Sequence, residues 1–430
     1  MIIKAELWDK MQFLFRHYYD RMVHCVLYYD KPINIDILKQ IIVWTVEKVP
    51  VLHSSFRYNA VEPYWETKDY TIDDIVTVDL NCNDIEQSIN DVIYECIPTD
   101  NNVQIKIGAF CDNNKSALAI IVNHMCFDGG DFKYFLYKLS ENYNKLLNKN
   151  YNLEIKQGSR SYDAVYTNLT DEERKIAEGL YKNISNVKDE HTFPLTNDSK
   201  LDKTAIHRRK IPEDLFLKFK QIGKVMGVTV NDLILTFYIT ALYKIGNYSK
   251  QDSLAIPCMV DLRRYMEDST KTGLTNHTGF MICNIEKLGN DINDTLIQVI
   301  RSIHKNKSDK YMGLYSLPLL KLAYGIFPYI ISETAIRIGY LNPLIGMSNI
   351  GVLNINKLKL GNSNLIDGFM TGGVKYKPYM QLALTTIKNE ITMTVAIRGN
   401  DEDKKIVNKF FDYIIDAIND FIELNKDKLN

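Results

Sequence analysis

The feature that most constrains the fold is an unbroken apolar stretch that leads into an amphipathic one. Residues 116–124 read Ser-Ala-Leu-Ala-Ile-Ile-Val-Asn-His, without the alternation of polar and apolar residues that a half-exposed strand shows. Such a run is typical of a strand that is buried on both faces of a sheet. After a loop at 125–130, apolar residues recur at helical spacing to about Asn148, and Asp131 is placed to cap this helix. The pattern predicts an α/β fold with the loop at the edge of a sheet.

The rest of the chain continues in the same mixed style. Residues 156–203 are mostly polar, and we expect them to hold one short helix and the boundary between two parts of the chain. The expected organisation is a first lobe at 1–165, a connection at 166–203 and a second lobe at 204–430. Helical spacing further predicts helices at 33–48, 84–97, 212–227, 233–245 and from 402 onward. Strands are predicted at 103–110, 205–211, 253–261, 280–285, 351–360 and 381–397, and residues 50–56 are predicted to form a turn that leads into a strand.

The overall composition narrows the class of protein. The 430 residues are 46% hydrophobic and carry a net charge of −1, which is typical of a globular protein and argues against a dedicated nucleic-acid binder. The seven cysteines form no Cys-x-x-Cys pair, so neither a disulfide framework nor a zinc site is indicated, and we expect no metal. The first ten residues carry charges where a secretory leader needs an apolar stretch. We therefore expect a cytoplasmic protein with reduced thiols.

The most apolar region, residues 316–347, is interrupted by Lys321, Glu333 and Arg337. No uncharged run within it reaches the roughly 18 residues that a membrane span requires, so we predict no transmembrane segment. A buried helix is the favoured interpretation. The lining of an apolar channel and a surface that touches lipid stay open as alternatives, and the region also fits a long-chain substrate.

The segment from His124 to Gly129 has the clearest chemical interpretation. It reads His-Met-Cys-Phe-Asp-Gly and places a histidine at the end of a core strand, which is where binding sites form in α/β proteins. Gly129 and Gly130 would let the backbone turn sharply at that edge. The alternative is a buried, hydrogen-bonded histidine beside an aspartate turn. We favour a functional His124, because a titratable side chain at the edge of a sheet is typical of a functional site.

This segment resembles the His-x-x-x-Asp-Gly signature of the chloramphenicol acetyltransferase-like superfamily. That group contains condensation domains, alcohol acetyltransferases, polyketide-associated acyltransferases and the plant BAHD enzymes. Other segments resemble those of the family in the expected order and span most of the chain, although His53 stands where the family usually has arginine. These segments are Pro50–Phe56, Val228–Leu235, Val260–Arg264, Asn276–Asn284 and Met347–Gly351.

The resemblance implies two chloramphenicol acetyltransferase-like α/β sandwich lobes with a tunnel between them. An acyl thioester of coenzyme A or of a phosphopantetheine carrier protein would enter from one side, and a hydroxyl or amine acceptor from the other. The family's histidine, here His124, would act as general base without an acyl-enzyme. Asp128 and Gly129 would be structural, with Arg263 of the second lobe as the ion-pair partner of Asp128. The resemblance also suggests Ser348 as an oxyanion donor, and Asn123 and Asn284 as further oxyanion or tunnel residues.

Departures from the family narrow this expectation. Asn123 stands where peptide-forming condensation domains usually have a second histidine, and the Asp-Phe-Gly-Trp-Gly of the plant enzymes is absent. We therefore expect a free-standing, monomeric acyltransferase whose co-substrate is an acyl-CoA or carrier-bound thioester, with no permanently bound cofactor. Two alternatives stay open: a stand-alone condensation enzyme that accepts only carrier-bound donors, and a catalytically silent binding protein of the same fold.

Three other features suggest chemistry but have simpler explanations. The basic run 207–210 fits the phosphates of coenzyme A, yet such a run is more often the solvated face of a strand. Cys126 lies within the motif loop, and we expect it to fill space. Asn276 and His277 either approach the tunnel or stabilise a turn.

Overall fold

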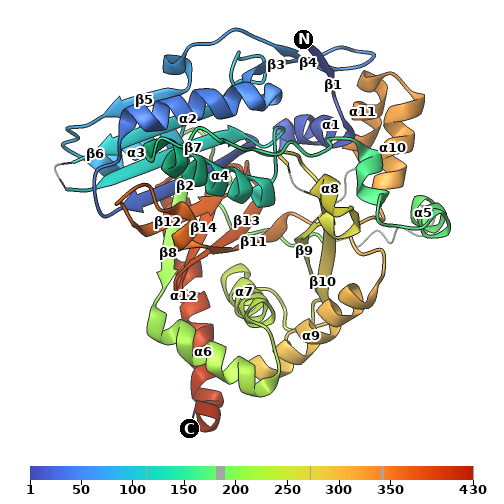
Figure 1. Cartoon of the computed structure of the whole chain (residues 1–430). Helices are drawn as coiled ribbons and strands as arrows, with labels where there is room; N and C mark the ends of the chain where they lie inside the picture. Colours follow the sequence, from blue (N-terminus) through green and yellow to red (C-terminus); the bar gives the residue numbers. More distant parts are fainter. Residues whose placement is uncertain (113, 181–188, 272, 340–342, 430) are drawn as a thin grey trace.

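The computed structural model describes residues 1–112, 114–180, 189–271, 273–339 and 343–429. Within these residues two large sheets, each packed against helices, form two lobes (Figure 1). A small third sheet consists of β1 (Ile2–Lys4), β4 (Tyr64–Thr67) and β3 (Ser54–Arg57). The predicted α/β class with two sheet-and-helix lobes is confirmed.

The first large sheet is buried on both faces, which explains why its central strand lacks polar alternation. In order across the sheet, the strands are β12 (Leu365–Thr371), β2 (Met22–Tyr29), β7 (Ser116–Asn123), β6 (Ile105–Cys111) and β5 (Val76–Asp79). The helices are α2 (Ile35–Lys48), α3 (Ile85–Ile93) and α4 (Gly129–Leu147). Along β7, Leu118 and Ile120 join the core that includes α2 and α4, whereas Ala119 and Ile121 join the core that includes α3.

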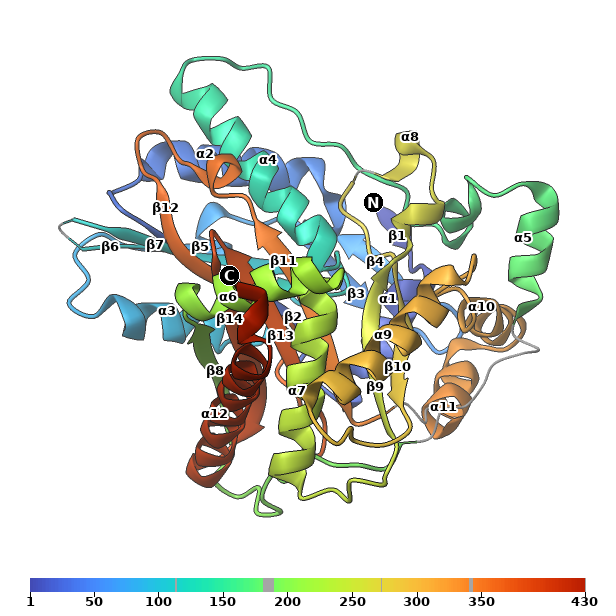
Figure 2. The ribbon, with the colours of Figure 1, turned by 90° about the horizontal axis from the view of Figure 1, so that it is seen from below.

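The second large sheet has a core of its own. Its strands, in order, are β10 (Thr278–Ile285), β9 (Leu254–Asp261), β11 (Ile345–Leu353), β13 (Met380–Ile387), β14 (Glu390–Gly399) and β8 (Lys203–Ile211). Its helices are α6 (Glu213–Met226), α7 (Val230–Gly246), α9 (Ile292–Ser308) and α12 (Asp401–Leu424), which lie together in Figure 2. Phe237 of α7 packs against Phe219 of α6 and Phe421 of α12, with ring centroids 5.5 Å apart in both pairs. Thr229 and Asp232 form a capping box at the start of α7.

Strand β12 connects the two lobes. It belongs to the C-terminal part of the chain but pairs antiparallel with β2, so the first sheet is not built from residues 1–165 alone. The chain then passes through 372–379, which we call the crossover segment, and returns to the second sheet as β13. The lobe boundaries at 165 and 204 stay a prediction, and residues 181–188 of the connection lie outside the described part of the chain.

Most predicted elements lie within a few residues of their expected bounds, with instructive exceptions. The strand expected at 351–360 is wrong: β11 ends at Leu353, and Asn354 caps a single turn at Ile355–Leu358. The run 381–397 forms two strands, β13 and β14, rather than one. Strand β2 was not predicted from the sequence, because the polar His24 interrupts its apolar run.

The apolar region 316–347 is not the buried helix that its composition favoured. It forms two helices, α10 (Leu317–Ile326) and α11 (Tyr329–Gly339), at the periphery of the molecule (Figure 1), and residues 340–342 lie outside the described part of the chain. The interpretation was wrong because apolar composition does not record which side of a helix meets the core. The exposed large side chains are Leu319, Leu322, Ile326, Phe327, Ile330, Ile331 and Ile338.

Three shorter helices complete the described chain: α1 (Leu7–Leu14), α5 (Asp171–Glu178) and α8 (Asp268–Lys271). Among the helices described, none is by itself long and apolar enough to cross a bilayer. Helices α6 and α7 meet that criterion only as a pair, which is bent by 113°.

Phe127 and Phe327 allow a direct comparison of a buried and an exposed phenylalanine. Phe127 is fully buried, with its ring centroid 5.8 Å from Phe132 and 5.7 Å from Phe135, whereas Phe327 is 54% exposed. We expect Phe127→Ala to lower the free energy of unfolding by about 3–5 kcal/mol, because it removes buried apolar surface and leaves a cavity. Phe327→Ala should change it by less than about 0.5 kcal/mol. Urea unfolding followed by circular dichroism measures both, and equal losses would contradict the packing described.

Candidate active site

The loop after β7 is held by backbone contacts from distant parts of the chain. The His124 N–H donates to the carbonyl oxygen of Arg21 (2.7 Å), and the His124 carbonyl oxygen accepts from Nδ2 of Asn276 (2.7 Å). Arg160 donates from Nη2 to the carbonyl oxygen of Met125 (2.8 Å), a contact that the sequence analysis missed. The backbone of His124 is therefore fixed on both sides.

Asp128, rather than Asp131, caps the helix that follows. Helix α4 begins at Gly129, and Oδ1 of Asp128 accepts from the N–H of Asp131 (3.0 Å). The predicted cap at Asp131 was wrong by three residues, because Asp131 supplies the third N–H of the first turn, which an N-cap oxygen accepts.

The second oxygen of Asp128 joins the two lobes. Oδ2 lies 3.0 Å from Nη1 of Arg263 and accepts from the N–H of His277 (2.9 Å) and the hydroxyl of Thr278 (3.2 Å). Nη2 of Arg263 also lies 2.8 Å from Oδ2 of Asp131. The expected ion pair between Asp128 and Arg263 is thus present, with side chains 6% and 12% exposed.

The two carboxylates of this network have different pKa values. Burial by itself raises the pKa of Asp128, but the Arg263 guanidinium and the N–H groups of Asp131 and His277 outweigh it and hold the pKa below its usual value. Burial and the negative charge of Asp128 raise the pKa of Asp131. Asp128 is therefore a structural anion, and its oxygens are occupied by the helix cap and the second lobe.

His124 is partly exposed, although its neighbours Asn123 and Met125 are buried. Burial of the ring is the largest influence and lowers its pKa, and the positive charge of Lys375 lowers it further. Asp128 and a hydrogen bond between the ring and the backbone of His124 act in the opposite direction. Only Nδ1 can reach the carbonyl oxygen of its own residue, and Nδ1 also lies 3.5 Å from Nδ2 of Asn276. A proton on Nδ1 would leave the Nε2 lone pair to act as a base. The lowered pKa favours the neutral form of the ring.

Lys375, which the sequence analysis missed, is the cation near His124. It lies in the crossover segment, with Nζ 3.6 Å from the centroid of the Tyr19 ring. This segment is fixed to the start of β2, because the Asp20 N–H donates to the Val374 carbonyl oxygen (3.2 Å) and Oδ1 of Asp20 accepts from the Val374 N–H (2.9 Å). Burial lowers the pKa of Lys375 to about 8, although Asp20 opposes this shift.

The structure does not bring Asn123 or Asn284 to the reactive side of His124. The Asn123 side chain is buried, with Nδ2 donating to Oε1 of Gln104 (2.8 Å) and Oδ1 accepting from the N–H of Met125 (3.0 Å). Asn284 lies on β10 six residues beyond Thr278, which is about 20 Å at roughly 3.3 Å per residue. A family likeness indicates a place in the chain but not the direction of a side chain, so the geometry gives no support to an oxyanion role for either residue.

Ser348 lies on β11, where it is partly exposed and pairs with Ala383 of β13. Nearby, Nζ of Lys133 donates to the carbonyl oxygen of Ile350 (2.7 Å), so this strand comes close to the helix that Asp128 caps. The role of Ser348 as an oxyanion donor stays a prediction.

The two glycines of the motif do not make the sharp turn that the sequence suggested. Neither Gly129 nor Gly130 has a positive φ, and the turn is made earlier, where the Cys126 N–H donates to the Asn123 carbonyl oxygen (2.8 Å). A Cβ at Gly130 would come within 3.3 Å of Oδ1 of Asp128, whereas a Cβ at Gly129 would meet no atom within 4 Å. Gly130 leaves room for the ion-pair network, and Gly129 borders open space.

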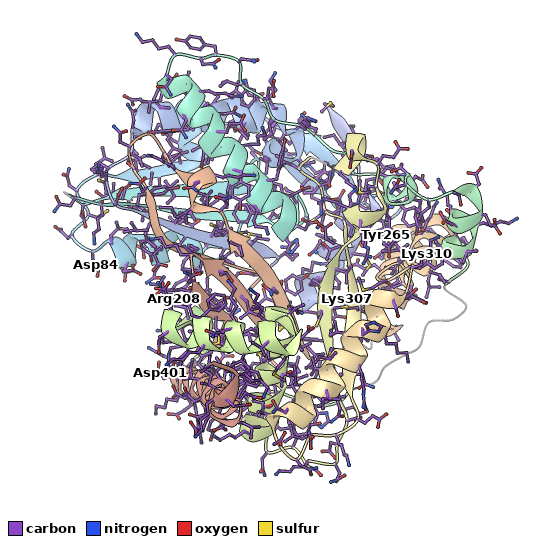
Figure 3. All side chains as sticks on the ribbon, turned by 60° about the horizontal axis from the view of Figure 1, so that its bottom comes forward. Asp84, Arg208, Tyr265, Lys307, Lys310 and Asp401 are labelled. Atoms are coloured by element: carbon purple, nitrogen blue, oxygen red, sulfur yellow. The ribbon has the colours of Figure 1, made fainter. Side chains whose placement is uncertain are left out.

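The basic run 207–210 is neutralised within the protein. Nη2 of Arg208 lies 2.8 Å from Oε2 of Glu86, in the helix that Asp84 caps, and Figure 3 shows Arg208 and Asp84 on the same side of the molecule. The two basic residues that follow have acidic partners at 2.7 and 2.9 Å. These pairs support the solvated-strand interpretation over a site for coenzyme A phosphates.

Two other candidate side chains are part of the core. Burial raises the pKa of the Cys126 thiol, which supports its role in filling space. The ring of His277 lies edge-on to Trp8, with centroids 4.6 Å apart, and its Nε2 lies 2.7 Å from the Ser159 carbonyl oxygen. Burial lowers the pKa of His277 to about 4. Both residues support the loop rather than react in it.

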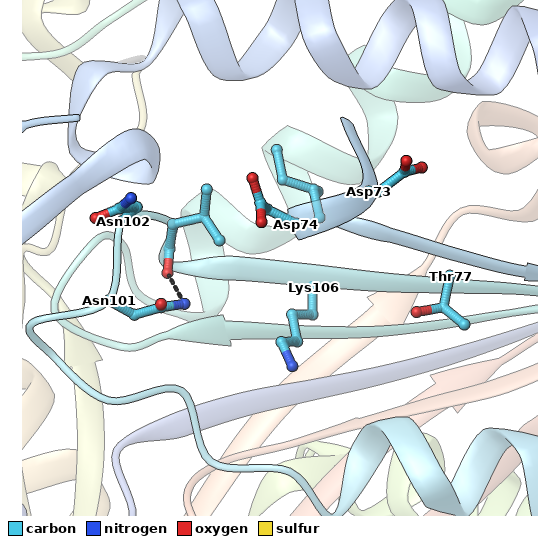
Figure 4. Close-up of a pocket in the computed structure, with 8 residues that line it drawn as sticks. Asp73, Asp74, Thr77, Asn101, Asn102 and Lys106 are labelled. Atoms are coloured by element: carbon cyan, nitrogen blue, oxygen red, sulfur yellow. Dashed lines mark hydrogen bonds between the residues drawn. The ribbon is translucent and has the colours of Figure 1, made fainter. Parts of the chain in front are cut away.

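Two surface pockets lie away from His124. One, of about 330 Å³, is lined by polar residues, among them Asn101, whose Nδ2 donates to the Val103 carbonyl oxygen at 3.2 Å (Figure 4). The other, of about 530 Å³, borders Asn284 and Arg301. Within the described ranges, no group of three or more His, Cys, Asp or Glu side chains is arranged to hold a metal ion.

Comparison with known proteins identifies the fold. No family model matches the sequence, and no curated protein matches it either. Solved structures match over nearly the whole chain. The first condensation domain of the CDA synthetase is 11% identical, with a TM-score of 0.69, over 97% of this chain and 96% of that one.

Two further structures match with similar TM-scores. Polyketide synthase associated protein 5 from Mycobacterium tuberculosis is 12% identical over 97% of this chain and 98% of its own, with a TM-score of 0.67. The trichothecene 15-O-acetyltransferase TRI3 from Fusarium sporotrichioides is 10% identical over 97% and 95%, also with a TM-score of 0.67. The chain therefore has the chloramphenicol acetyltransferase-like fold that condensation domains and acyltransferases share. At such low identities the likeness shows the fold alone.

Removal of Asp128 tests the junction between the lobes. We expect Asp128→Ala to lower the free energy of unfolding by about 3 kcal/mol, because it leaves buried Arg263 without one partner and α4 without its cap. The matched control is Asp261→Ala, since Asp261 also lies 3.0 Å from Nη1 of Arg263 but has a 62% exposed side chain. We expect Asp261→Ala to lower the free energy of unfolding by less than about 1 kcal/mol. Urea unfolding measures both changes. Equal losses for the two variants would contradict a larger stabilising contribution from the buried pair of Asp128 and Arg263.

Removal of Lys375 tests the electrostatics of His124. A nearby cation disfavours the imidazolium, so we expect Lys375→Met to raise the pKa of His124 toward its ordinary value. Proton–carbon NMR of histidine-labelled protein across pH 4–8 measures this pKa, with His124→Gln assigning the resonance. Lys405→Met, which changes a 72% exposed lysine, is the control and should leave the titration unchanged. An unchanged or lower pKa in Lys375→Met would contradict the influence of Lys375.

Proposed function

We propose that the protein is an acyltransferase that moves an acyl group from a thioester to a hydroxyl or amine, with His124 as general base. The observation that carries this proposal is the state of His124: a partly exposed residue with a lowered pKa and a fixed backbone at the end of a core strand. The fold shared with condensation domains and acyltransferases supports it.

The proposed chemistry needs one base and no covalent intermediate. Nε2 of His124 removes the proton of the acceptor O–H or N–H as the acceptor oxygen or nitrogen attacks the thioester carbonyl carbon. The new C–O or C–N bond forms, the tetrahedral intermediate collapses, and the C–S bond breaks. The imidazolium then returns the proton to the departing thiolate. The products are an ester or amide and a free thiol, and His124 is again neutral.

The surroundings of His124 fit this cycle. The lowered pKa keeps the ring unprotonated near neutral pH, where a general base is needed. Lys375 would disfavour the imidazolium and so promote return of the proton to the thiolate. Ser348, on the β11 strand that reaches α4, is the proposed donor to the oxyanion, and Asp128 with Arg263 keeps the loop in place.

A condensation enzyme that uses only carrier-bound donors is the second candidate, since a condensation domain is among the similar structures. Asn123 gives no support to it, because its side chain is engaged by Gln104 rather than presented beside His124. Such an enzyme would release no thiol from acyl-CoA but would do so from an acyl-phosphopantetheinyl carrier. The third candidate, a silent binding protein, would bind thioesters and release thiol from neither donor.

Thiol release is the experiment that tests the proposal. The intact protein is incubated with short- and long-chain acyl-CoAs and with alcohol and amine acceptors, and free thiol is measured with a chromogenic disulfide. We expect acceptor-dependent release that His124→Ala lowers by about 10²–10⁴-fold, because the general base is lost.

The matched control for this experiment is His304→Ala, since His304 is an exposed histidine on α9, and its activity should equal that of the unaltered protein. Circular dichroism confirms that both variants are folded. Equal turnover by His124→Ala and His304→Ala would remove His124 from the mechanism.

A further inference from the structure

Helices α10 and α11 leave most of their apolar side chains uncovered. The two helices meet at Phe327 and Pro328 and lie at the edge of the molecule in Figures 1 and 2. On their inner side Tyr324 and Tyr329 are buried, and their rings stack with centroids 5.6 Å apart. On the outer side lies what we call the hairpin patch, with side chains 45–76% exposed: Leu319, Leu322, Ile326, Phe327, Ile330, Ile331 and Ile338.

The hairpin patch is a fixed part of the surface. The N–H groups of Tyr329 and Ile330 donate to the carbonyl oxygens of Val61 (3.0 Å) and Ala60 (3.1 Å). This contact adds the 66% exposed side chain of Val61 to the same apolar area. Contiguous apolar surfaces of this kind mark contact sites on soluble proteins.

The charges of the hairpin suit an anionic partner. Its acidic residue, Glu333, is buried and paired with Arg16, so it does not face outward. Lys321 and Arg337 are both exposed, but Lys321 lies 3.2 Å from Asp163 and 3.9 Å from Glu178, which offset its charge. Residues 317–339 therefore present apolar side chains and the cationic Arg337 to the outside, and no exposed carboxylate of their own.

We propose that the hairpin patch docks on the surface of a lipid bilayer that contains anionic lipids. Interfacial helices place aliphatic and aromatic side chains among the acyl chains and cationic side chains beside the headgroup phosphates. Helices of 10 and 11 residues are too short to span the hydrocarbon core, so the hairpin would lie in the interface. The patch is almost entirely aliphatic, whereas the core of a protein interface is enriched in aromatic residues and arginine.

Docking would bring the lipid phase to the chain segment that supports the candidate site. Arg16, which pairs with Glu333 of α11, lies five residues before Arg21, whose carbonyl oxygen accepts from the His124 N–H. An apolar substrate dissolved in the membrane would be presented on that side. The docking itself does not rest on the proposed acyl transfer and is tested without any activity measurement.

Vesicle flotation of the intact protein tests the proposal. The probes are vesicles of phosphatidylcholine alone and of phosphatidylcholine with 30% phosphatidylglycerol. We expect the protein to float with the anionic vesicles, and the double substitution Ile326→Glu with Ile330→Glu to weaken binding at least 10-fold. The matched control is Leu217→Glu with Val225→Glu on α6, where the side chains are 43% and 63% exposed, and it should bind as the unaltered protein does.

A fluorescent reporter locates the contact. In Phe327→Trp the new indole should shift its emission to shorter wavelength and be quenched by brominated lipid when anionic vesicles are added. Circular dichroism confirms that each variant is folded, which is expected because every changed side chain is exposed. Arg337→Gln should reduce the preference for anionic over neutral vesicles.

Three results would overturn the proposal. The first is failure of the unaltered protein to float with anionic vesicles. The second is equal binding by the patch variant and the α6 control. The third is elution of the unaltered protein at twice its mass, with the patch variant at single mass, because the patch would then be an interface between two copies of the chain.

Discussion

The ion pair between Asp128 and Arg263 is the interaction on which the site depends. It connects the start of α4 in the first lobe to the turn after β9 in the second, and both side chains are nearly buried. The same carboxylate caps α4 and accepts from the N–H of His277, so the helix start and the segment that carries Asn276 share one anchor. A buried charge without its partner is costly, which makes this junction an all-or-none contact between the lobes.

The arrangement separates support from reactivity. Both oxygens of Asp128 accept structural hydrogen bonds, and Arg21 and Asn276 hold the backbone of His124, which is partly exposed. The pKa of His124 is lowered by burial and by the charge of Lys375. Lys375 lies in the crossover segment, which belongs to the C-terminal part of the chain. The hairpin patch lies on the side of α1, where an apolar phase would approach the same segment.

Sequence reasoning found the elements whose signals are local. The apolar run before His124 and the helical stripe after it are short-range patterns, and the motif placed His124 and Asp128 correctly between them. Arg263 was found through a family likeness, and its contact is present. The cap was misplaced from Asp128 to Asp131 because both residue types satisfy the cap preference, and only the backbone shows which oxygen meets an N–H.

The sequence by itself determined many of the strands and helices of the core, although not β2, and which loop carries the titratable histidine, because periodicity and capping act between residues a few positions apart. The tertiary structure alone decided that β12 completes the first sheet, that Lys375 lies beside His124, and that α10 and α11 expose their apolar sides. These outcomes depend on contacts between residues hundreds of positions apart, whose energies arise only when the whole chain packs.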